Sequence, residues 1–109
     1  MNEIEQLQAW FRDQCDGTWE HTYGLNIGTL DNPGWSLSID LKGSALENTP
    51  FKAVTQNVSD TSEPLNDDWY VCSVEDKQFN AFGGPDQLKT ILSVFLDWSK
   101  QNPGPKQKG

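Results

Sequence analysis

The stretches QCDGTWEH (residues 14–21) and TLDNPGW (residues 29–35) decide how the first half of this chain folds. They hold one of the two cysteines, the only histidine and two of the five tryptophans. Gly17 is a typical residue to end a helix, and Pro33 followed by Gly34 is a strong turn signal. We therefore predict that a helix ends in the first stretch and that two strands meet at the second.

Hydrophobic spacing predicts the elements on either side of these stretches. Residues 3–14 are predicted to form a helix, because apolar residues recur there at spacings of three, four and seven. Residues 18–30 and 35–41 alternate in the manner of strands, and the second alternation is the cleaner one. The predicted apolar rows are Ile4, Leu7, Trp10 and Phe11 on the helix, Trp19, His21, Tyr23, Leu25 and Ile27 on the first strand, and Trp35, Leu37, Ile39 and Leu41 on the second.

The loop between the two strands has to satisfy a parity condition. With an even number of loop residues, Leu37 would share a face with Gly28 rather than with Ile27. We therefore expect an odd loop or a bulge, and Gly28 and Gly34 are the residues able to supply the bulge.

The second half of the chain predicts further strands and a final helix. Strands are expected at residues 51–58, 69–74 and 79–82. The second of these is expected to be central because it is apolar or small on both faces. Residues 59–68 form an acidic loop, and residues 83–86 open a helix with Pro85 near its first turn.

The predicted fold is α+β: an antiparallel, meander-like sheet of about five strands, ordered close to 1-2-3-4-5, with an N-terminal and a C-terminal helix packed on it. Residues 1–101 form a single domain, and residues 102–109 read as a flexible basic tail.

Composition restricts the classes of partner. Sixteen acidic against eight basic residues give a net charge of −8, which repels nucleic acid and anionic membranes and attracts basic proteins. The same acidity also serves simply to keep a protein in solution.

No apolar run is long enough to cross a membrane, and the start of the chain is acidic rather than basic, so we expect a cytoplasmic protein. In that reducing compartment Cys15 and Cys72 are expected to be free thiols.

Cys15 and His21 are the residues that raise the question of catalysis. A small cysteine-dependent enzyme, using thiol or sulfur-transfer chemistry at Cys15, is the alternative to a binding protein. The spacing of these two residues matches no common zinc motif, and we expect neither a metal nor a cofactor. Asp16 is predicted to be a turn residue. On a strand, Glu20 and His21 would point to opposite faces, which argues against a catalytic dyad.

Polar side chains on the predicted sheet face and in the acidic loop are candidates for binding a basic protein. An exposed polar face with an acidic loop can dock such a partner, although an ordinary solvated sheet face shows the same alternation. The candidate residues are Glu20, Asn26, Ser38 and Asp40 on the face, and Asp60, Glu63, Asp67 and Asp68 in the loop.

The two opening stretches resemble the immunity protein 53 family, small bacterial proteins that protect a cell from a polymorphic toxin. The resemblance spans mainly residues 7–47, and the residues that match the motif are Cys15, Asp16, Gly17, Trp19, Glu20, His21, Asp31, Asn32, Pro33, Gly34 and Trp35. It implies a non-enzymatic protein that binds and blocks a cognate toxin domain inside the producing cell. We expect that toxin to be basic, and the immunity protein to be a monomer or a weak dimer.

Overall fold

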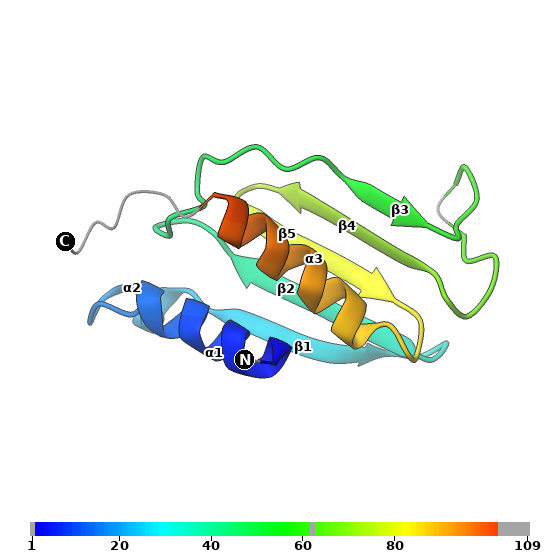
Figure 1. The fold of residues 1–109 in the computed structure, drawn as a ribbon, viewed down its shortest axis with the longest axis horizontal. Helices are drawn as coiled ribbons and strands as arrows, with labels where there is room; N and C mark the ends of the chain where they lie inside the picture. Colours follow the sequence, from blue (N-terminus) through cyan, green and yellow to red (C-terminus); the bar gives the residue numbers. More distant parts are fainter. Residues whose placement is uncertain (1, 62, 103–109) are drawn as a thin grey trace.

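The computed structural model describes residues 2–61 and 63–102, which form one antiparallel sheet with two long helices on the same face (Figure 1). The elements in chain order are α1 (Glu3–Gln14), α2 (Trp19–Thr22), β1 (Leu25–Leu30), β2 (Gly34–Asp40), β3 (Val54–Gln56), β4 (Tyr70–Glu75), β5 (Gln78–Gly83) and α3 (Leu88–Gln101). The α+β class, the five antiparallel strands and the two terminal helices are confirmed. Because both helices lie on one side, the other face of the sheet is left without a covering layer in the described part of the chain.

The strand order corrects the prediction of a simple meander. The sheet runs β1-β2-β5-β4-β3, so β5 is the central strand and β4 lies next to it. A tight turn folds β5 back onto β4: Asp76 and Lys77 both have positive φ, at 53° and 59°, as a two-residue hairpin requires. β5 also carries the buried Phe79 and Ala81, whereas β3 is only three residues long and suits an edge. Residues 41–53 therefore carry the chain from β2 to the far edge of the sheet.

Three element boundaries also differ from the sequence prediction. Residues 18–24 do not extend the first strand; α2 takes their place, because the Asp16 side chain bends the chain there. The strand predicted over residues 51–58 shortens to β3. α3 begins at Leu88 rather than beside Pro85, since residues 84–87 first close a turn in which the Gln87 N–H donates to the Gly84 carbonyl oxygen at 3.0 Å.

Other predictions agree with the structure. α1 covers the predicted residues 3–14, and a capping box between Asn2 and Glu5 closes its start. α3 ends at Gln101, as predicted, while residues 103–109 of the predicted tail lie outside the described residues. The parity condition is met by a three-residue loop, residues 31–33, which pairs Ile27 with Leu37 without a bulge.

The core lies between the helices and the sheet and is rich in aromatic rings. Phe79 of β5 and Phe95 of α3 are fully buried, with ring centroids 5.1 Å apart. Trp98 and Phe51 pack together at one end of this cluster, with ring centroids 4.9 Å apart. Trp10 of α1 packs on Phe95, with ring centroids 5.0 Å apart. α1 and α3 thus share one aromatic core, which fixes the helices relative to the sheet.

Candidate functional site

The first motif stretch forms a corner between α1 and β1 that is held by two carboxylates. Asp16 Oδ1 accepts hydrogen bonds from the backbone N–H groups of Thr18 and Trp19, both at 2.9 Å. Glu20 reaches back and accepts from the N–H groups of Asp16 at 3.0 Å and Gly17 at 2.8 Å. Hydrogen bonds from backbone N–H groups hold the pKa of Glu20 below its ordinary value. The N–H of Glu20 itself has the largest effect, followed by those of Asp16 and Gly17. The turn role predicted for Asp16 is confirmed, and Glu20 and His21 lie on a helical turn rather than on a strand.

This corner positions the Trp19 side chain against α1 and the loop that follows β2. The indole is buried, and its Nε1–H donates to the Lys42 carbonyl oxygen at 2.8 Å. Its ring packs edge-to-face on the rings of Trp10 and Phe11 of α1, with centroid distances of 6.2 and 5.9 Å. Gly43, with a φ of +80°, passes so close that a Cβ there would stand 3.0 Å from the Trp19 ring. These residues of the motif therefore join α1 to the loop that follows β2.

Both thiols lie in surroundings that disfavour the reactive thiolate form. Cys15 donates to the Phe11 carbonyl oxygen at 3.3 Å, and desolvation, followed by the charges of Glu20 and Asp16, raises its pKa. Burial raises the pKa of Cys72 to about 12. A reactive cysteine is usually accessible and surrounded by positive charge. Cys15 is partly exposed but has acidic neighbours, and Cys72 is buried. His21 is exposed, and no group of three or more His, Cys, Asp or Glu side chains within residues 2–61 and 63–102 could hold a metal ion.

The second motif stretch ties two loops together at the other end of the sheet. Trp35 Nε1–H donates to the Pro85 carbonyl oxygen at 2.9 Å, which joins the β1–β2 hairpin to the loop before α3. Gly34 lies directly against the Gly83 carbonyl oxygen of β5, where no Cβ would fit. Both stretches of the motif are therefore engaged in holding the fold, apart from any contact that they make with a partner.

The uncovered face of the sheet carries aligned polar side chains. One row crosses four strands, with Asn26, Ser38, Asn80 and Ser73 as successive neighbours in the register. In the next row Phe82 is 40% exposed between Ser36 and Val71. The structure thus brings the predicted Asn26 and Ser38 together with Asn80 and Ser73, which sequence reasoning missed because strand order is not visible in local alternation.

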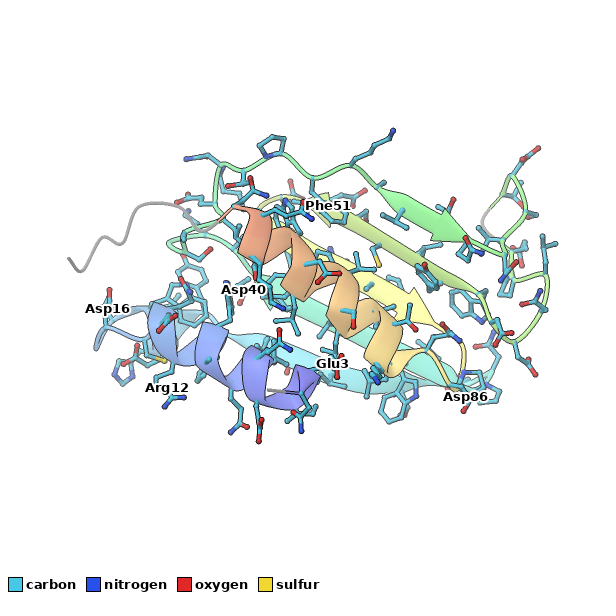
Figure 2. The ribbon with its side chains drawn as sticks, in the orientation of Figure 1. Glu3, Arg12, Asp16, Asp40, Phe51 and Asp86 are labelled. Atoms are coloured by element: carbon cyan, nitrogen blue, oxygen red, sulfur yellow. The ribbon has the colours of Figure 1, made fainter. Side chains whose placement is uncertain are left out.

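Asp40 lies at one end of this face and is engaged within the protein (Figure 2). Its Oδ2 accepts from the Gly24 N–H and its Oδ1 from the Gln78 side chain, both at 2.9 Å. Beside it is a polar pocket of about 280 Å³, whose lining includes both acidic and basic side chains: Tyr23, Asp40, Lys42, Glu75, Asp76, Lys77, Gln78 and Asn80.

The four candidate residues of the acidic loop lie at the opposite end of the sheet from Glu20 and Asp40 (Figure 1). The residue 57–68 loop, the β1–β2 turn and the β5–α3 loop meet there, because β2 and β5 are antiparallel and the Gly84 N–H donates to the Trp69 carbonyl oxygen at 2.9 Å. Figure 2 shows the separation of the ends, with Asp16 at one and Asp86 at the other. We define the carboxylates gathered in these three loops as the acidic end: Asp31, Asp60, Glu63, Asp67, Asp68 and Asp86.

Comparison with known proteins identifies a family. The model of the family described as Immunity protein 53 matches residues 4–100 of the chain. The comparisons with curated proteins and with solved structures gave no significant match. Within the described residues, no helix is both long and apolar enough to span a membrane.

Proposed function

The chain belongs to the immunity protein 53 family, and on this premise we propose that it binds a cognate bacterial toxin domain and neutralises it by covering its active site or substrate groove. Family membership supports the immunity role. The charge of −8 supports a basic toxin, met in the cytoplasm of the producing cell by a monomer or a weak dimer of this chain. The role is non-enzymatic in this proposal, and the raised pKa of both thiols supports that part of it.

The distribution of charge is the observation that carries the mechanism. The acidic end gathers its six carboxylates in three loops, and the basic residue closest to them in sequence is Lys89, in the first turn of α3. We propose that this end steers the toxin toward the chain, with association faster than the ~10⁵–10⁶ M⁻¹s⁻¹ of uncharged partners. The polar residues of the uncovered face, Asn26 and Ser38 among them, are proposed to contact the toxin once it has been captured. Glu20 and Asp40 remain candidates, although both already accept hydrogen bonds from backbone N–H groups.

A matched pair of charge reversals tests this mechanism. Asp60→Lys with Asp67→Lys alters the acidic end, and Glu75→Lys with Asp97→Lys makes the same change of net charge at exposed positions toward the other end. Association with the toxin domain encoded beside this chain's gene would be followed by stopped flow at several salt concentrations.

We expect the pair at the acidic end to slow association roughly tenfold at low salt and to flatten its salt dependence, and the second pair to have a smaller effect. Equal effects of the two pairs would contradict steering by the acidic end. An unimpeded toxin activity in the presence of the wild-type chain would contradict the immunity role itself.

A further inference from the structure

β1 is an edge strand that nothing in the described part of the chain pairs on its outer side. It is six residues long, contains no proline and no charged residue, and its partner β2 lies on one side only. The other edge strand, β3, has three residues. Natural sheets usually protect an edge by shortening it, bulging it or placing charges on it, because unpaired N–H and C=O groups recruit other strands. β3 shows the first of these protections, and β1 shows none of them.

The register shows which backbone groups of β1 point outward. The Asp40 N–H donates to the Gly24 carbonyl oxygen at 2.9 Å, so these residues form a hydrogen-bonded pair. Bonded and non-bonded pairs alternate in an antiparallel ladder, which makes Asn26–Ser38 and Gly28–Ser36 bonded pairs as well. The N–H and C=O groups of Leu25, Ile27 and Thr29 therefore point away from β2.

Exposed apolar side chains accompany this edge. Ile27 is 39% exposed, and on α1, which lies over β1 in Figure 1, Ile4 and Phe11 are 51% and 36% exposed. Ile4 and Phe11 are seven residues apart and so lie on the same side of the helix. Of the five large apolar residues that the structure leaves exposed within its described ranges, three thus belong to α1 and β1. An added strand would pair the edge and cover part of the exposed Ile27 side chain.

The charges around β1 indicate what kind of protein supplies the strand. Asp31 directly follows β1, and Glu5 is exposed on α1. At the other end of β1, acidic side chains outnumber basic ones: Asp13, Asp16, Glu20 and Asp40 against Arg12 and Lys42. A second copy of this chain could add to β1 in the antiparallel direction, with Ile27 of one copy opposite Ile27 of the other. Asp31 of each copy would then approach Asp16 and Glu20 of the other copy, and these like charges would repel. A basic segment instead finds an excess of acidic groups at both ends of an uncharged edge. We propose that the toxin docks by adding an extended, basic segment to β1 as a sixth strand, an inference that rests on the proposed function.

Residue-resolved amide hydrogen exchange tests this docking mode on the whole chain, free and saturated with the toxin domain encoded beside its gene. The expected result is an alternating pattern within β1. The outward amides of Leu25, Ile27 and Thr29 gain at least roughly tenfold protection in the complex, while those of Asn26 and Gly28, already bonded to β2, change little. Tight binding without protection of the outward amides would overturn the proposal and leave the immunity role standing. Absence of binding would remove the proposed function and this inference together.

Two further outcomes are separated by the same experiment. Protection of the outward amides in the free protein, rising with protein concentration, would identify a second copy as the occupant and overturn the proposal. The variant Thr29→Pro removes one outward N–H and leaves the β1–β2 hydrogen bonds in place. With the exchange of the Asn26 and Gly28 amides unchanged as proof of folding, we expect it to weaken toxin binding by at least roughly fivefold. Unaltered affinity of this folded variant would contradict strand addition.

Discussion

The carboxylate of Glu20 closes the corner between α1 and β1 by accepting two backbone N–H groups that the turn would otherwise leave unpaired. These groups also bring its pKa below the ordinary value. A carboxyl whose pKa is lower in the folded than in the unfolded chain stabilises the fold above its unfolded pKa of about 4.3, and this stabilisation is lost as the pH falls through the folded pKa.

Glu20→Gln is therefore expected to be less stable than the wild type at pH 6, with a difference that narrows as the pH falls below about 4. Urea unfolding of both proteins across this pH range measures the difference directly. Glu75→Gln is a matched control, since Glu75 is exposed and lies at the end of β4. A difference between wild type and Glu20→Gln that stays constant with pH would show that the side chain acts by shape rather than by charge.

The two cysteines carry a second prediction at the residue scale. Because the thiolate is the reactive form, the raised pKa of Cys15 and the pKa of about 12 for Cys72 both predict slow alkylation at pH 8. We expect Cys15 to react more slowly than a cysteine of the urea-unfolded chain, and Cys72 to react only after unfolding. Mass spectrometry of the wild type and of Cys15→Ser assigns each rate. Rapid alkylation of Cys15 in the folded protein would revive the thiol-enzyme alternative.

At the scale of elements, the close approach of β2 to β5 depends on a residue without a side chain. A Cβ at Gly34 would meet the Gly83 carbonyl oxygen, a backbone atom that cannot move aside without shifting β5. Gly34→Ala is expected to destabilise the protein by about 1–3 kcal/mol, as overpacking usually does. Gly24→Ala is the control, because its Cβ would meet nothing within 4 Å. Urea unfolding that found the two variants equally stable would contradict this account of the glycine.

Local patterns predicted some elements well and could not predict others. The periodicity of α1 and the buried row Ile91, Leu92, Phe95 and Leu96 of α3 are local properties, and both helices are found. Parity required an odd loop or a bulge between β1 and β2, and the structure has the odd loop. Residues 18–24 alternate like a strand, yet two hydrogen bonds to Asp16 turn them into α2.

The strand order and the composition of the candidate surface depended on contacts distant in sequence. Nothing in the alternation of β2 or β5 states that they are neighbours, so Asn80 could not be placed beside Ser38. For the same reason the gathering of Asp31 and Asp86 with the acidic loop was not foreseen. The binding roles of Glu20, Asn26, Ser38, Asp40, Asp60, Glu63, Asp67 and Asp68 stay predictions.

At the scale of the whole molecule, the fold separates the parts that hold it together from those left for a partner. The helices and one sheet face enclose the aromatic core, while the other face, the β1 edge and the acidic end are uncovered in the described structure. The molecule is elongated, at 45 × 26 × 23 Å, and the acidic end occupies one extremity of the sheet. This arrangement predicts a partner that approaches by charge and is then held by shorter-range contacts.

The central claim is that this chain binds and blocks a basic toxin, and calorimetric titration with the toxin domain encoded beside its gene tests it most directly. The titration would be run at low and at physiological salt, because exposed charges are screened within about 8 Å at physiological ionic strength. The account predicts tight binding that weakens as salt increases. Tight binding indifferent to salt would contradict the acidic interface, and absence of binding at either salt concentration would contradict the central claim.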